Sequence, residues 1–231
     1  MKRMAIFVEG QTEQLFVTKL LIEIAGEKNI SIDQEKAVTK HGSRFFSVIQ
    51  ASKNLDRKYY VLIRDSGNDE LVQSDIRDAC ENLAKKDYDR ILGLRDVYPK
   101  TFADIPRLEL GLKYGIPTRF IPIHIILAIM EVEAWFLAET THFSRIHPSL
   151  TNDLIKRNLN FDPETGDVES RPHPSQDLDF IYRLSGLAYN KKKTKVERTI
   201  QVLDYSAIYL TLIGKVKNLK KLIDQIDSFL D

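Results

Sequence analysis

Three short apolar runs, each ending on an acidic residue, limit most strongly what this chain can fold into. The runs end in Glu9, Asp65 and Asp96. Continuous apolar runs of this length, bounded by turn residues, predict buried strands of a parallel sheet. Open α/β sheets place their ligand sites at the carboxyl ends of such strands. The three acids are therefore the first candidates for a functional site.

Helical patterns separate the apolar runs, and this alternation predicts βαβ units. Phe16, Leu20 and Ile24, for example, recur at four-residue spacing after the first run. Right-handed crossovers would bring every strand-to-helix loop to one edge of the sheet. The pattern predicts strands over 4–9, 31–39, 59–65, 90–96 and 119–129, and helices over 12–27, 43–55, 71–86, 104–114 and 130–138.

The chain from about Thr140 onward lacks strand patterns. Its prolines predict a long loop over 160–178, and helical patterns follow over 176–188 and 195–229. We therefore expect an α/β fold with a mainly parallel, Rossmann-like sheet flanked by helices. The expected organisation is an α/β domain over 1–139, with a helical extension over 140–231 packed on it.

The composition excludes several classes of protein. With 231 residues, of which 43% are hydrophobic, the chain can bury a substantial core. A net charge of +1 provides no global attraction to nucleic acid, so such binding would need a local basic patch. The single Cys80 excludes an internal disulfide and a cysteine-based zinc site. The apolar stretch 121–130, interrupted by Pro122 and His124, is too short to span a membrane. We expect a soluble, cytoplasmic protein without a leader.

Acidic residues gathered at one edge of a sheet favour a metal cation. Carboxylates brought together repel one another, and their pKa values rise unless a cation neutralises them. Mg²⁺ and Mn²⁺ prefer such oxygen ligands and keep several water molecules for substrate phosphates. A site of this kind can activate water and stabilise the leaving oxygen during phosphodiester cleavage.

Each candidate residue also has a plainer interpretation. Asp65 begins an ordinary turn sequence, Asp96 precedes a possible turn, and Glu9 could be a solvated strand end. Gly10 would let the chain turn sharply and approach a ligand closely. Glu13 could reach the same space as Glu9, or it could stabilise the start of the helix.

Two motifs make the chain resemble a bacterial family of Toprim-like proteins. They are Val-Glu-Gly-x-Thr-Glu over residues 8–13 and Glu-x-Glu-Ala-Trp over residues 131–135. The family is related to the Toprim domain of the overcoming-lysogenisation-defect nucleases, and the resemblance covers residues 4–139. It implies a Toprim fold in which Glu9 is a metal ligand and general base or acid. Asp96 would match the first aspartate of the Asp-x-Asp motif in that fold.

The chain departs from the Toprim pattern after this first aspartate. Val97 and Tyr98 follow Asp96, so the second aspartate is missing. Glu133, Glu131 or Asp65 could supply the absent ligand. Glu131 and Glu133 are two residues apart and cannot share a helical face. Trp135 is interpreted as a core residue rather than a base-stacking one.

One dense basic cluster is the local candidate for contact with nucleic acid. It contains Lys191, Lys193 and Lys195, together with their neighbour Lys192. A charge run of this kind is usually the solvated start of a helix. In the functional interpretation it binds backbone phosphates with salt-sensitive affinity. The five histidines show no metal-ligand spacing.

The sequence thus favours a Mg²⁺- or Mn²⁺-dependent Toprim-type phosphodiesterase acting on nucleic acid. By resemblance, it would belong to a bacterial defence system or mobile element and work beside a partner ATPase. The alternative is a catalytically silent Toprim-like subunit that binds the ATPase or a nucleic acid, which the missing aspartate supports. A phosphotransferase acting on small molecules is disfavoured, because the chain has no phosphate-binding loop.

Overall fold

A computed structural model of the protein describes residues 1–52, 56–112, 114–190 and 192–231. The chain divides into two compact units, each assembled from separate stretches of sequence. Unit 1 comprises residues 1–95, 104–127 and 224–231, and unit 2 comprises residues 96–103 and 128–223. This division differs from the boundary expected after residue 139, because 128–139 belong to unit 2 and the C-terminal residues return to unit 1.

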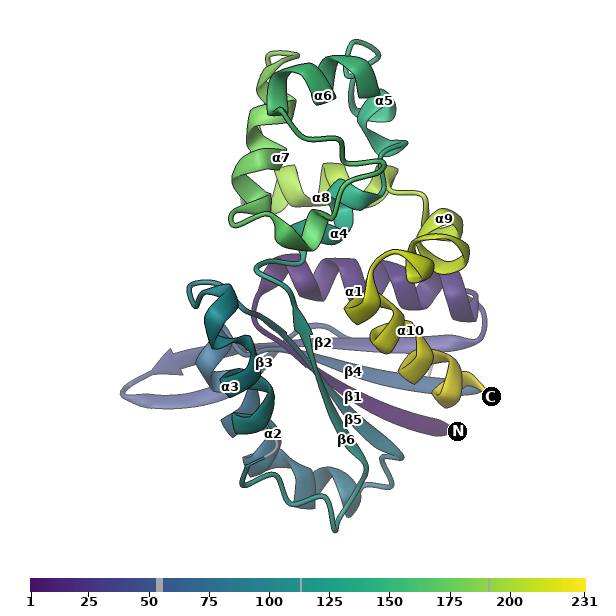
Figure 1. The fold of residues 1–231 in the computed structure, drawn as a ribbon. Coiled ribbons are helices and arrows are strands. Elements are labelled where there is room, and N and C mark those ends of the chain that lie inside the picture. Colours follow the sequence, from purple (N-terminus) through teal and green to yellow (C-terminus); the bar gives the residue numbers. More distant parts are fainter. Residues whose placement is uncertain (53–55, 113, 191) are drawn as a thin grey trace. The chain divides into compact units, whose positions relative to one another are not determined.

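Unit 1 is built on a six-stranded sheet with the strand order β3-β2-β4-β1-β5-β6 (Figure 1). β1 pairs in parallel with both β4 and β5, and β2 pairs in parallel with β4 and antiparallel with β3. The prediction of an α/β fold with a mainly parallel, Rossmann-like sheet is therefore confirmed. The strands are β1 (Lys2–Val8), β2 (Ile30–Lys40), β3 (Ser43–Gln50), β4 (Tyr59–Asp65), β5 (Arg90–Asp96) and β6 (Ile123–Ala128).

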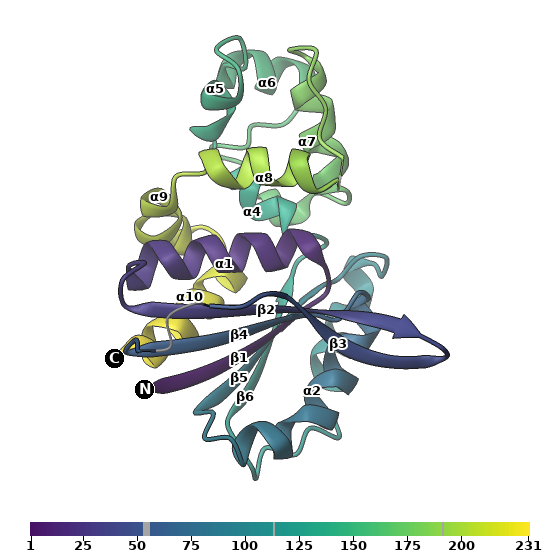
Figure 2. The ribbon, with the colours of Figure 1, turned by 180° about the vertical axis from the view of Figure 1, so that it is seen from behind.

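Helices cover both faces of the sheet, with α1 (Gln11–Ala25) and α2 (Asp69–Ala84) on opposite sides (Figure 2). Successive side chains of a strand point to opposite faces. Ala5 and Phe7 of β1 accordingly join the core cluster under α2, together with Val72 and Ile76. α1 contacts β1, β2 and β4. Because residues 4–8 of β1 are buried on both faces, they are continuously apolar rather than alternating. The short helix α3 (Ile105–Gly111) follows β5 and precedes β6 in the sequence, and none of its residues is buried.

Residues 43–50 form strand β3, so the helix predicted over 43–55 is wrong. β3 and β2 are joined by a tight turn at His41 and Gly42, whose φ angles are 52° and 77°. Positive φ at both positions is typical of the two-residue hairpin turn that matches strand twist. Phe46 and Ile49 also fit helical spacing, and pairing with β2 decides between the two structures. Residues 53–55 of the predicted helix lie outside the described residues.

Unit 2 is helical, as predicted, but its helices are shorter than the sequence suggests. The expected helix over 195–229 is interrupted where Asp204 caps α9 by accepting a hydrogen bond from the amide of Ala207 at 2.9 Å. α7 begins inside the expected loop, with Pro174 at its first turn, a position that favours proline. Among the described helices, none has the length and apolarity needed to cross a bilayer. The helices that lie wholly in unit 2 are α4 (Glu133–Ala138), α5 (His142–Ile146), α6 (Asn152–Leu159), α7 (Pro174–Arg183), α8 (Lys193–Val202) and α9 (Tyr205–Leu210).

The last turns of α10 (Lys217–Leu230) belong to unit 1. The ring of Tyr59 lies 5.5 Å from that of Phe229, and its hydroxyl donates to the carbonyl of Leu230. Arg90 donates to carbonyls near the end of the same helix, including that of Gln225 at 2.9 Å. Helix C-termini favour such cationic donors. These contacts attach the end of the chain to the beginnings of β4 and β5.

Candidate functional site

The carboxyl ends of β4, β1 and β5 carry the three acids that the sequence singles out. β1 lies between β4 and β5 and runs parallel to both, so the three strands end at the same edge of the sheet. Asp65 is the last residue of β4, Glu9 directly follows β1, and Asp96 is the last residue of β5. Glu9 and Asp65 therefore lie at one edge of the sheet of unit 1, whereas Asp96 begins the stretch 96–103 that belongs to unit 2.

Asp65 is a buried carboxylate, with 2% of its surface exposed. Its Oδ1 accepts a hydrogen bond from the amide of Gly67 at 2.8 Å, and Nζ of Lys36 lies 3.6 Å from its Oδ2. Lys36 is the residue of β2 that pairs directly with Asp65, and its side chain is 46% exposed. Burial raises the pKa of Asp65, while the Gly67 amide and the Lys36 ammonium act in the opposite direction.

We expect Asp65→Asn to raise the melting temperature at neutral pH in EDTA by about 2–4 °C. Because the folded-state pKa of Asp65 is raised, its contribution favours folding below the unfolded pKa of about 3.9 and is lost as pH rises through the folded pKa. The gain from the substitution should therefore shrink as the pH falls toward about 4.

Thermal unfolding monitored by circular dichroism across this pH range measures the effect. Asp78→Asn is the matched control, because the Asp78 side chain is 78% exposed on α2. An Asp65→Asn variant that melts below the wild type at neutral pH would show that the contact with Lys36 outweighs the cost of burial.

Glu9 and Glu13 flank the start of α1. Glu9 is half-buried and Glu13 is 3% exposed. The space where a Cβ of Gly10 would stand is 3.4 Å from Oε2 of Glu13, so the Glu13 carboxylate folds back over the helix start. This position fits the interpretation of Glu13 as an acid that stabilises the first turn.

The chain bends at Gly10 between β1 and α1, but the bend does not require a glycine. The φ and ψ of Gly10 are −160° and −165°, an extended conformation that any residue can adopt. As the N-cap of α1, Gly10 contributes no capping side chain. The start of α1 is instead anchored by Gln14, whose Nε2 donates to the carbonyls of Glu35 and Ile63 at 2.9 and 3.2 Å.

Asp96 is 2% exposed and holds the beginning of α4. Its Oδ1 accepts a hydrogen bond from the amide of Val132, the N-cap of that helix, at 3.0 Å. A carboxylate at this position satisfies an amide that the helix itself leaves unpaired. Tyr98 is 42% exposed, and its amide donates to the carbonyl of Met130.

The two glutamates of the Glu-x-Glu-Ala-Trp motif contact residues of unit 2 that are distant in the sequence. Glu131 accepts hydrogen bonds from the amide and the hydroxyl of Ser175 at 2.8 and 2.9 Å, which caps the start of α7. Glu133 accepts from the hydroxyl of Tyr189 at 2.8 Å. Trp135 is 1% exposed, so its interpretation as a core residue is confirmed. These contacts of the motif support the architecture of the unit.

The described residues contain no ready-made cage for a metal ion. Among them, no three His, Cys, Asp or Glu side chains are grouped closely enough to hold one. Mg²⁺, however, usually binds through one or two carboxylates, with water and substrate phosphates completing its shell. The carboxylate oxygens of Glu9 and Asp65 have the donor chemistry that such a cation requires. These residues therefore fit an open Mg²⁺ site and do not form a closed one.

The basic cluster lies at the start of α8. Lys193 is exposed, and its Nζ is 3.8 Å from Oε1 of Glu197 in the next turn. Lys195 is partly buried. Lys191 lies outside the described residues. An ion pair within one helix is the expected condition of a solvated helical surface.

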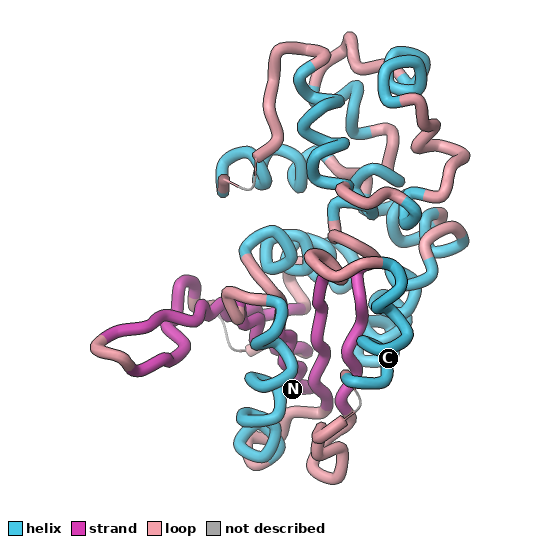
Figure 3. The backbone as a smooth tube through the Cα atoms, turned by 60° about the vertical axis from the view of Figure 1, so that its left-hand side comes forward, coloured by secondary structure: helices cyan, strands magenta, loops and turns pink. Residues whose placement is uncertain are grey.

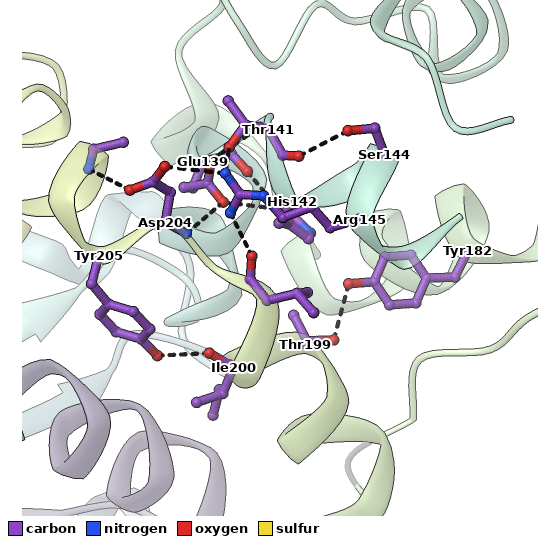
Figure 4. A network of polar contacts seen from close by, with 12 residues as sticks. Glu139, Thr141, His142, Ser144, Arg145, Tyr182, Thr199, Ile200, Asp204 and Tyr205 are labelled. Carbon is purple, nitrogen blue, oxygen red and sulfur yellow. Dashed lines mark hydrogen bonds and ion pairs between the residues drawn. The ribbon is translucent and has the colours of Figure 1, made fainter. Parts of the chain in front are cut away.

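A buried polar network surrounds Glu139 in unit 2 (Figure 4), and no sequence motif indicates it. Glu139 accepts hydrogen bonds from the amides of Thr141 and Asp204 at 3.0 and 3.1 Å, and also from the Thr141 hydroxyl. Nδ1 of His142 bonds to the carbonyl of Glu139, and burial lowers the pKa of His142 to about 4. Burial also raises the pKa of Glu139, against the effect of these hydrogen bonds.

The chain matches a described protein family. No curated protein and no solved structure matches the chain. One family model matches residues 8–210, a span that includes the strand-end acids and the helices of unit 2 as far as α9. The chain belongs to the family described as Domain of unknown function (DUF4276).

Proposed function

We propose that the protein is a divalent-cation-dependent phosphodiesterase that acts on nucleic acid. The observation that carries the proposal is the placement of acids at the ends of adjacent parallel strands. β4 ends in Asp65, and Glu9 directly follows β1. Open α/β sheets bind their ligands outside this edge. The resemblance of residues 8–13 and 131–135 to Toprim motifs supports the same activity.

The proposed roles follow from burial and position. Glu9 is the general base or acid and a cation ligand, and its half-buried position keeps the carboxylate within reach of water. Asp65 is the second ligand, because a cation would offset the cost of burying its charged carboxylate. Asp96, at the end of β5, is the third acid of the proposal. Mg²⁺ or Mn²⁺ bound here would supply water activation and stabilisation of the leaving oxygen. Glu133 and Glu131 stay the alternatives to Asp65 as the ligand that replaces the missing aspartate.

Further parts of the proposal rest on resemblance and composition. Lys193 and Lys195, with Lys191, would bind backbone phosphates. A partner ATPase, a cytoplasmic location and a role in bacterial defence or a mobile element complete it.

The purified full chain, incubated with labelled single- and double-stranded DNA and RNA, tests the activity. Each substrate is incubated with Mg²⁺, with Mn²⁺ and with EDTA, and products are separated on denaturing gels. Cleavage that requires the cation and stops in EDTA supports the proposal. Intact substrate under every condition would overturn the proposal that the chain cleaves nucleic acid by itself.

A second candidate is a catalytically silent subunit that binds a partner ATPase or a nucleic acid. The observation that favours it is the engagement of Asp96 with the Val132 amide, together with Tyr98 in place of the second Toprim aspartate. Nucleic-acid binding without cleavage in the same assay would select this candidate.

A further inference from the structure

The β2–β3 hairpin extends beyond the edge of the sheet that carries the candidate site. Pairing between β2 and β4 ends with Lys36 opposite Asp65, whereas pairing between β2 and β3 continues to Lys40 opposite Ser43. Residues 37–46, here called the ribbon, therefore form a two-stranded projection past the carboxyl edge. Figure 3 shows this projection, with its turn at the tip.

One face of the ribbon contacts the rest of unit 1. Arg44 donates to the two carboxylate oxygens of Asp75 in α2 at 2.5 and 2.7 Å, and to the carbonyl of Ser66 at 2.9 Å. The ring of Phe46 packs edge to face on Phe7 at 6.3 Å, and the Arg64 guanidinium lies over it at 4.7 Å. These contacts hold the ribbon in place without using its opposite face.

The opposite face continues from Asp65 as a row of cationic and apolar side chains. Directly paired residues share a face of a sheet, as does every second residue of a strand. Lys36 therefore shares a face with Asp65, and Phe45 and Lys40 follow on that face. Lys36 and Lys40 are four residues apart, which is about 13 Å along a strand. Phe45 lies between them and is 47% exposed.

The segment that carries this row has a positive formal charge. Residues 36–52 contain three Lys or Arg and no Asp or Glu, while all 33 acidic residues lie elsewhere. Alternating phosphate-binding cations and an exposed aromatic ring are the elements of a single-stranded nucleic-acid site, because every unpaired base has a face that can stack. Because the ribbon carries basic side chains and no acidic ones, it also attracts the negatively charged phosphate backbone.

We infer that the ribbon, together with Lys36 at its base, binds single-stranded nucleic acid along this face, with phosphates at Lys36 and Lys40 and a base stacked on Phe45. The inference rests on the proposed function, to which it adds the form of the substrate and its path toward Asp65. Binding does not require cleavage, so the two can fail separately.

The experiment is a fluorescence-anisotropy titration of labelled oligo-dT and oligo-U with the full chain in EDTA. Phe45→Ala should weaken binding about tenfold, the loss expected for one stacked base. Lys40→Gln should lower the log–log salt slope by about 0.7, the value for one lost contact with a single strand. Comparison of the two oligonucleotides distinguishes DNA from RNA as the ligand.

Two control variants carry the same chemical changes away from the ribbon. Lys86→Gln alters an exposed lysine just beyond the end of α2, and Phe180→Ala alters a 42% exposed ring on α7. Wild-type affinity in Phe45→Ala and Lys40→Gln would overturn the inference. So would tighter binding of a duplex than of either single strand. Loss of a dimer in Phe45→Ala without loss of binding would instead make the ribbon a contact with a second copy.

The same titration separates the inference from the proposed function. Ribbon-dependent binding without cleavage by the wild type would leave the inference standing and remove the nuclease. Cleavage that is unchanged in Phe45→Ala and Lys40→Gln, without ribbon-dependent binding, would remove the inference alone.

Discussion

Replacing Glu9 by glutamine should abolish cation-dependent cleavage of nucleic acid while the protein stays folded. Glutamine keeps the shape of the side chain but neither accepts a proton from water nor provides an ionised ligand. Loss of a general acid or base alone lowers the rate by about 10²–10⁴-fold. The melting temperature in EDTA should be unchanged or raised, because one charge is removed from an edge that also carries Asp65.

Initial cleavage rates with Mg²⁺ and thermal unfolding in EDTA measure the two parts of this prediction. Glu27→Gln is the matched control, because Glu27 is exposed just beyond the end of α1. It should cleave and melt like the wild type. A Glu9→Gln variant that retains activity but melts at a much lower temperature would show that Glu9 has a structural role.

The largest loss of stability is expected from Glu139→Ala in unit 2. Glu139 is 1% exposed and accepts hydrogen bonds from the amides of Thr141 and Asp204 (Figure 4). The substitution leaves these buried donors without their acceptor, and each unsatisfied group costs about 1–3 kcal/mol. A total loss of about 3 kcal/mol would lower the melting temperature by about 6–12 °C.

Glu139→Gln should fall between alanine and the wild type, because it keeps the volume and one acceptor oxygen. Glu197→Ala, which removes only a 3.8 Å surface pair with Lys193, should change the free energy of unfolding by less than about 0.5 kcal/mol. Circular dichroism during thermal unfolding compares the variants. If Glu139→Ala and Glu197→Ala melt at the same temperature, the network does not stabilise the unit.

The central strands of the sheet were predictable because their signal is local. β1, β4 and β5 contain runs without charged residues over 4–8, 59–63 and 91–94, and burial on both faces is the condition that selects such runs. β3 was not predictable in this way. Its spacing of apolar residues is compatible with a helix, and only the turn at His41 and Gly42 and the pairing with β2 make it a strand.

The candidate site was predictable only in part, for the same reason. Strand-end placement of Glu9, Asp65 and Asp96 follows from the apolar runs that precede them. The partners of these acids do not, because Val132 is 36 residues from Asp96 and Ser175 is 44 residues from Glu131. Nothing near an acid in the sequence tells whether it will cap a distant helix or face a ligand.

The sequence by itself determined the α/β class, the parallel central strands and the edge of the sheet where acids end those strands. These features depend on hydrophobic periodicity and on the handedness of crossovers, which act over short stretches of chain. Tertiary structure alone decided that Asp96 and Glu131 hold the starts of α4 and α7, and that Lys36 meets Asp65 at the base of the ribbon. A buried carboxylate must find donors or a cation wherever the fold provides them, and the fold brings them from distant parts of the chain.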